Sequence, residues 1–163
     1  MEINFENLAK QVGSALLSKN LKLVTAESCT GGWISTVITF IPESSHWFER
    51  GFITYSSKSK EELLNVDKKI ITEYGVVSAQ TAEFMALGAL KNSHADISLA
   101  ITGIAGPGGG CIKNPIGTVY VAFLYKNHSK IIHKLFLNDE RNIIRANAVK
   151  FALQELIKFI ANV

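Results

Sequence analysis

Residues 25–32 read Thr-Ala-Glu-Ser-Cys-Thr-Gly-Gly, and they lie between an apolar run, Leu21 to Val24, and a helix-like run that begins at Trp33. A short buried strand that turns through two glycines into a helix is typical of α/β proteins, which bind ligands at the carboxyl ends of their strands. The turn offers hydroxyls, a carboxylate and a thiol, and the free N–H groups of the next helix favour an anion. Ser28 or Thr30 could instead simply cap that helix, so the octapeptide alone supports both interpretations.

Composition indicates a globular protein that fits one domain. The chain has 163 residues, of which 47% are hydrophobic and 19% charged, and its net charge of +3 is scattered. That distribution argues against a nucleic-acid or membrane partner. No apolar stretch approaches the ~20 residues of a membrane span, and the acidic N-terminus is unlike a signal peptide, so we expect a cytoplasmic protein. Cys29 and Cys111 suit reduced thiols, and the four histidines show no zinc-site spacing.

Hydrophobic periodicity predicts alternating helices and strands. Helices are expected over 3–18, 33–40, about 56–64, 78–91 and 139–161, with a helical link or turn over 65–75. Strands are expected over 21–25, 51–55, 97–102, 117–125 and 131–137, the last two joined as a hairpin. This order predicts a three-layer α/β/α sandwich with a mixed sheet of about five strands.

Positively charged residues at helix starts are the first chemical clue. Helix N-termini carry partial positive charge, so cations are disfavoured there. Lys60 lies in the first turn of one expected helix, and Arg141 and Arg145 share a face at the start of the last. The simpler interpretation is that these charges lie on a solvated surface by chance, because the unfavourable interaction with the helix N-terminus is small. The functional interpretation is that Lys60 is a partly unprotonated base and that the arginines bind a phosphate or carboxylate.

Ser45 is a candidate nucleophile for that base. It lies in a polar bend before the strand that leads to Tyr55 and Lys60, and serine–lysine pairs are a known variant of nucleophile plus base. A Ser-Ser pair in a loop is usually no more than a turn feature. The sequence does not show whether Ser45 and Lys60 meet in space.

A glycine-rich loop follows the strand that ends at Thr102. Residues 103–110 are neither a phosphate-binding loop, since no Gly-Lys-Ser/Thr follows, nor a dinucleotide fingerprint, since no helix opens from them. Gly103 and its neighbours could wrap their N–H groups around a ligand, or they could form a simple connection. Thr102 is the side chain at this strand end that we expect to point into a site.

Taken together, these motifs resemble the C-terminal domain of the competence-damage-inducible protein family in its stand-alone form, the nicotinamide mononucleotide deamidases. The matching stretches run in the family's order over nearly the full length, which implies one amidohydrolase domain over residues 1–163. They are residues 25–32, Ser44-Ser45 with 47–51, Thr54-Tyr55-Ser56 with Lys60, 102–107, 115–119, and Arg141 with Arg145.

The resemblance implies hydrolysis of the nicotinamide mononucleotide carboxamide to nicotinate mononucleotide and ammonia, in pyridine nucleotide salvage, without metal or organic cofactor. It implies a homodimer, with Ser45 as the nucleophile and Lys60 as the base. The implied substrate contacts are Tyr55, Thr102, Arg141, Ser28, Thr30, Gly31, Gly103 and Arg145.

Three alternatives stay open from the sequence. The chain could bind the nucleotide without turning it over, since family membership does not guarantee catalysis. It could be a partner in DNA uptake or repair, which only the family's name suggests and which the scattered charge disfavours. Finally, Ser28 or Cys29 could be the nucleophile instead of Ser45.

Overall fold

A computed structural model describes residues 3–136 and 140–163 of the chain. The sheet has five strands in the order β2-β1-β3-β4-β5. β1 (Leu23–Glu27), β2 (Phe48–Ile53) and β3 (Ile97–Gly103) are parallel, whereas β4 (Thr118–Tyr125) and β5 (His128–Leu135) form an antiparallel hairpin. The predicted mixed sheet of about five strands is confirmed.

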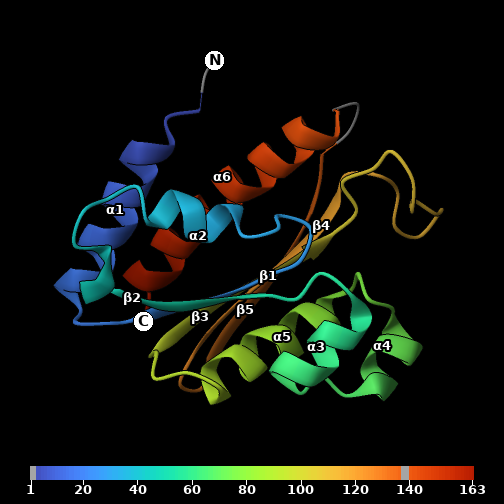
Figure 1. Ribbon diagram of the computed structural model, residues 1–163, viewed down its shortest axis with the longest axis horizontal. Coiled ribbons are helices and arrows are strands. Elements are labelled where there is room, and N and C mark those ends of the chain that lie inside the picture. The colour runs from blue at the N-terminus through green and yellow to red at the C-terminus, as the bar shows by residue number, and fades with distance from the viewer. Residues whose placement is uncertain (1–2, 137–139) are drawn as a thin grey trace.

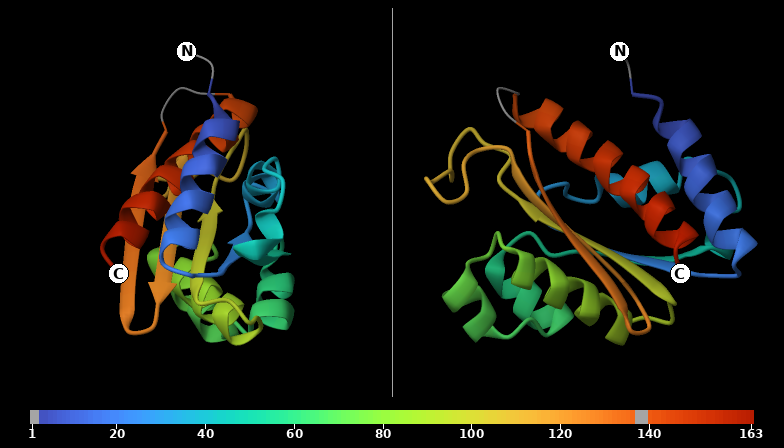
Figure 2. Two further views of the ribbon diagram at one scale, coloured as in Figure 1. Left: turned by 90° about the vertical axis from the view of Figure 1, so that its left-hand side faces the viewer. Right: turned by 180° about the vertical axis from the view of Figure 1, so that it is seen from behind.

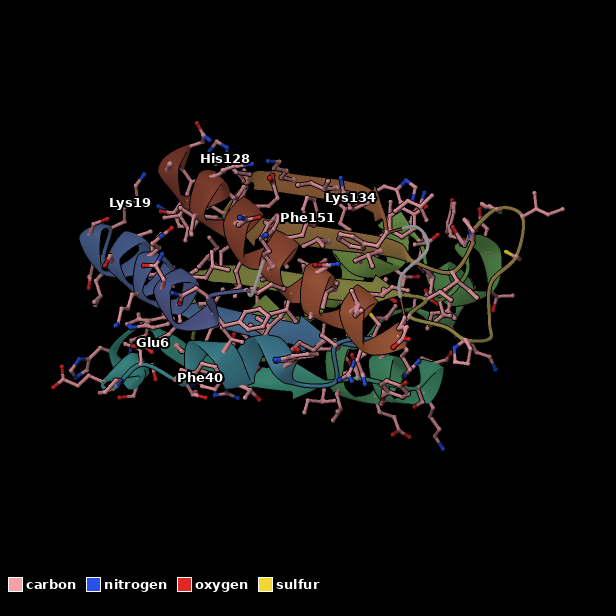
Figure 3. The ribbon with its side chains drawn as sticks, turned by 90° about the horizontal axis from the view of Figure 1, so that it is seen from above. Glu6, Lys19, Phe40, His128, Lys134 and Phe151 are labelled. Atoms are coloured by element: carbon pink, nitrogen blue, oxygen red, sulfur yellow. The ribbon has the colours of Figure 1, made fainter. Side chains whose placement is uncertain are left out.

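Helices cover both faces of this sheet, as the prediction of an α/β/α sandwich required. One layer holds α1 (Phe5–Ser18), α2 (Trp33–Ile38) and α6 (Arg141–Ala161), and the other holds α3 (Ser57–Leu64), α4 (Lys68–Tyr74) and α5 (Ala79–Lys91) (Figures 1 and 2). Seen from above, α1, α2 and α6 lie side by side, and Phe151 of α6 faces Lys134 of β5 (Figure 3).

The alternation of side chains along the strands divides the core in two. Leu23, Leu99 and Val121 face the α1–α2–α6 layer, whereas Val24, Ala26 and their neighbours face α5. On the α5 side many residues are alanines, which lets the helix lie close to the sheet. Gly88 likewise lets α5 lie close to the end of α3, because a Cβ at this position would lie 2.0 Å from the Leu64 carbonyl oxygen.

The structure defines two details that the sequence prediction left open or placed differently. The link over residues 65–75 contains a helix of its own, α4, capped by Asp67, so three helices separate β2 from β3. β2 begins at Phe48, three residues earlier than expected, and ends before Tyr55. Residue 137, where the last strand was expected to end, and Asp139, where the last helix was expected to begin, lie outside the described residues.

No helix among residues 3–136 and 140–163 is long and apolar enough to cross a membrane. Within the same residues, no group of three or more histidine, cysteine, aspartate or glutamate side chains could hold a metal ion.

Candidate active site

The carboxyl ends of the three parallel strands meet at one edge of the sheet. Ser28 follows β1 directly, Tyr55 follows β2, and Thr102 is the penultimate residue of β3. The backbone N–H of Ser28 donates to Ile101 O at 3.0 Å, which places Ser28 beside the end of β3. The expectation that the chain presents its polar turn at the carboxyl ends of the strands is therefore met.

A cavity of about 450 Å³ opens at this edge. Its wall includes Ser28, Tyr55, Thr102, Gly103 and Arg141, together with part of the glycine loop. The volume lies within the usual range for small-molecule sites. Five of the residues predicted to bind substrate thus share one cavity.

Lys60 is fully buried and lies next to Ser28. Its Nζ donates to Ser28 Oγ at 2.9 Å and to the Thr54 carbonyl oxygen at 2.6 Å. Burial lowers the pKa of the Lys60 ammonium from 10.5 to about 8, because a charged group loses hydration there. A substantial neutral fraction is therefore available near physiological pH.

Helix α3 delivers Lys60 to this position. Ser56 caps the helix in a capping box with Ser59, so that the helix begins at Ser57, four residues after the end of β2. Lys60 and Leu64 are the buried residues of α3, and they share one face because they are four positions apart. That shared face with Leu64 is the sequence signal that Lys60 points into the protein.

Ser45 does not meet Lys60. Ser45 is exposed in a single 3₁₀ turn, η1 (Ser44–His46), which precedes β2, and the carbonyl of neighbouring Trp47 accepts from Leu23 N at the start of β1. Ser45 therefore precedes the amino end of β2, whereas Ser28 follows the carboxyl end of the parallel neighbour β1. The six residues of β2 alone span roughly 20 Å. The structure contradicts the predicted contact between the two side chains and gives Lys60 the partner Ser28.

Glu27 shapes the turn after β1, a role that the sequence did not reveal. Its buried carboxylate accepts hydrogen bonds from the N–H groups of Gly32, Ile34 and Ser35 at 2.8–3.1 Å. It also accepts from the hydroxyls of Thr30 and Ser35, both at 2.7 Å. The N–H groups at the start of α2, expected to face a ligand, are therefore taken by the protein's own carboxylate.

Three of the residues predicted to bind substrate do not line the cavity. The Thr30 hydroxyl donates to Glu27, and Thr30 is fully buried. Arg145 donates to the carbonyls of Cys29 and Thr30, and a Cβ at Gly31 would lie 3.5 Å from Arg145 Nη2. Thr30, Gly31 and Arg145 are thus placed to support the turn, and none of them lines the cavity.

Arg141 and Tyr55 form a polar bridge at the cavity mouth. Arg141 Nη2 donates to the Tyr55 hydroxyl at 2.9 Å, and Nη1 donates to the carbonyl of Gly106 in the glycine loop. Tyr55 is 60% exposed and lines the cavity, so a ligand can reach it. The start of α6, the end of β2 and the glycine loop therefore meet at one point.

The Cys29 thiol is in its unreactive, protonated form at neutral pH. It is buried beside Ser28, and burial raises the pKa of this thiol to about 12. A thiol with such a pKa is almost entirely protonated at neutral pH, whereas the thiolate is the reactive form. The protonated Cys29 thiol and the hydrogen bond from Lys60 to Ser28 therefore favour Ser28 over Cys29 as a nucleophile.

Comparison with known proteins identifies the family of the chain. Residues 5–160 match the sequence model of the family described as CinA C-terminal domain. The chain is 44% identical over 149 residues, 91% of its length and 90% of the relative's, to nicotinamide-nucleotide amidohydrolase PncC of Escherichia coli (strain K12). It is 41% identical over 162 residues, 99% of both chains, to PncC of Enterobacter agglomerans.

A solved structure has the same fold. The crystal structure of competence/damage inducible protein CihA from Agrobacterium tumefaciens superposes with a TM-score of 0.89 and 39% sequence identity. The match covers 97% of this chain and 96% of that one.

Proposed function

The chain belongs to the CinA C-terminal domain family, and we propose that it is an amidohydrolase that converts nicotinamide mononucleotide to nicotinate mononucleotide and ammonia. Relatives that it matches over nearly their whole length carry the name nicotinamide-nucleotide amidohydrolase. The observation in the structure that carries the proposal is the hydrogen bond from buried Lys60 to Ser28, which lines the cavity. The reaction would serve pyridine nucleotide salvage.

In this mechanism Ser28 is the nucleophile and Lys60 is the base. Neutral Lys60 accepts the hydroxyl proton of Ser28, while one of its N–H groups continues to donate to the Thr54 carbonyl. The Ser28 oxygen attacks the amide carbon, and Lys60 then passes the proton to the departing ammonia. Water hydrolyses the resulting ester, with Lys60 again as the base. Ser28 therefore takes the role that the sequence resemblance gave to Ser45.

The oxyanion of the tetrahedral intermediate needs hydrogen-bond donors next to Ser28. The backbone N–H of the residue after a nucleophile is such a donor in related strand–turn–helix sites, and here that residue is Cys29. No other residue of the described chain accepts a hydrogen bond from this N–H. It is therefore available to the substrate.

The cavity mouth fits the rest of the nucleotide. The exposed Tyr55 ring offers an aromatic face to the cationic pyridinium, and Arg141 offers a planar donor to the phosphate. Thr102 and Gly103 form the wall between Ser28 and the glycine loop. Gly103 keeps this wall close, because a Cβ there would lie 3.1 Å from the Cys29 sulfur. We propose that one domain carries the whole site; the homodimer and the cytoplasmic location stay predictions.

The proposal is tested by measuring ammonia from nicotinamide mononucleotide, free nicotinamide and the dinucleotide in parallel, with nicotinate mononucleotide identified as the product. We expect turnover of the mononucleotide in preference to the other two. Saturable binding of the mononucleotide without ammonia at any protein concentration would show the alternative, a nucleotide-binding domain without catalysis.

A further inference from the structure

Arg145 holds the turn that carries Ser28. Its Nε donates to Cys29 O at 3.1 Å, and its Nη2 donates to Thr30 O at 2.9 Å. Nη1 reaches Asn142 Oδ1 at 3.3 Å, and the guanidinium carbon lies 5.3 Å from the centre of the Trp33 ring. The guanidinium is thus directed at the protein's own backbone, outside the cavity.

The two carbonyls belong to the central residues of a β-turn. Gly31 N donates to Ser28 O at 3.0 Å, which closes a four-residue turn around Cys29 and Thr30. Type I and type II turns differ in the orientation of the central peptide, so this peptide is the part of a turn that can be reversed. The contact from Arg145 to Cys29 O acts on that peptide.

Holding a carbonyl also directs an N–H group. In a planar trans peptide the C=O of Cys29 and the N–H of Thr30 point in opposite directions. Arg145 therefore turns the Thr30 N–H away from itself. The N–H groups of Cys29 and Thr30 have no acceptor on another residue of the described chain, whereas Glu27 takes those of Gly32, Ile34 and Ser35.

We infer that Arg145 is a positioning residue for amide hydrolysis: by binding the carbonyls of Cys29 and Thr30 it fixes the turn that carries Ser28 and the Cys29 N–H that stabilises the oxyanion. The inference rests on the proposed function. When the bond between Ser28 Oγ and the amide carbon forms, the hydroxyl proton goes to Lys60 and the carbonyl electron pair moves to oxygen. Fixed donors stabilise that charge without reorganising. The resemblance implied a substrate contact for Arg145, and the two roles predict different kinetics.

The Arg145→Ala variant should lose turnover and keep substrate affinity. We expect kcat to fall roughly 10- to 100-fold with KM within about twofold, less than the loss of an oxyanion donor itself. The loss should be partial, because the variant would not fully reverse the Cys29–Thr30 peptide. Reversal would place β-branched Thr30 at positive φ, which such residues disfavour. Guanidinium chloride at low millimolar concentration should restore part of kcat, and sodium chloride at equal ionic strength should not.

Two further variants separate positioning by Arg145 from substrate binding by Arg141. We expect Arg145→Lys to have a kcat between those of Arg145→Ala and the unmodified protein, because a single ammonium cannot reproduce the planar guanidinium. It also provides a folded variant if the alanine variant is unstable. Arg141→Ala, at the cavity mouth, should instead raise KM. A raised KM with unchanged kcat in the Arg145 variants, or no change in either constant, would overturn the inference.

A second readout separates this inference from the proposed function. A sulfonyl fluoride reacts with a serine by forming an O–S bond and releasing fluoride, while the proton passes to the base. We expect Ser28 to be sulfonylated roughly 10-fold more slowly in Arg145→Ala, because this transition state also places negative charge on oxygen. Absence of ammonia from the unmodified protein would refute the proposed function alone. Equal sulfonylation rates in the two proteins would refute the role of Arg145.

Discussion

At the scale of single residues, Lys60 is a buried ammonium placed to exchange a proton with a serine. Its hydrogen-bond partners are Ser28 Oγ and Thr54 O, and no carboxylate among residues 3–136 and 140–163 pairs with it. Desolvation therefore controls its pKa, which burial lowers to about 8. Such a depressed pKa gives a lysine the neutral fraction that a general base requires.

The pH dependence of kcat/KM tests this role. The base form of Lys60 is the neutral one, so kcat/KM should rise with pH and level off above about 8. At pH 7 roughly a tenth of the molecules would carry neutral Lys60, since each unit below the pKa reduces that form tenfold. A profile for nicotinamide mononucleotide that is flat between pH 6 and 9 would contradict this assignment.

Cys29→Ala tests the rival nucleophile. Because burial keeps the Cys29 thiol protonated, removing it should change kcat by no more than about threefold. The backbone N–H of this residue, which the mechanism uses, remains in the variant. Loss of ammonia release in a folded Cys29→Ala protein would instead identify the thiol as the nucleophile.

At the scale of elements, helix packing fixes the position of the base. α5 lies close to the end of α3, the helix that carries Lys60, because Gly88 has no side chain. The contact is with the backbone carbonyl of Leu64, which cannot rotate away as a side chain could.

Gly88→Ala should therefore destabilise the protein although alanine is the better helix former. We expect the free energy of unfolding to fall by about 2 kcal/mol, the usual scale for overpacking. Denaturant titration measures this change. Gly108→Ala is the matched control, because a Cβ there meets nothing within 4 Å. If Gly88→Ala were as stable as the control, the packing of α5 on α3 would be looser than the structure indicates.

The element scale also explains why the sequence paired the wrong serine with Lys60. Ser45 and Lys60 flank one strand in the sequence, but a strand separates its flanks by its full length. Ser28 and Lys60 are 32 positions apart, yet β1 and β2 are parallel neighbours whose carboxyl ends coincide. Only the order of strands in the sheet brings these two residues together, and hydrophobic periodicity does not specify that order.

At the scale of the whole molecule, the layers and the mixed sheet were predictable. The apolar run before Thr25, the alanine-rich helix after Ser78 and the hairpin around Asn127 each carry a strong local signal. The location of the cavity was predictable too, since ligands lie at the carboxyl ends of parallel strands. The roles of Glu27, Thr30 and Arg145 were not, because they depend on which backbone groups of one turn remain unpaired after folding.

The central claim is that Ser28, paired with Lys60, hydrolyses the carboxamide. Its most direct test is ammonia release from nicotinamide mononucleotide by Ser28→Ala and Ser45→Ala, two identical chemical changes at opposite ends of the parallel strands. We predict that Ser28→Ala loses roughly 10³-fold or more in kcat, whereas Ser45→Ala keeps the rate of the unmodified protein. Full activity in Ser28→Ala together with an inactive, folded Ser45→Ala would contradict the account.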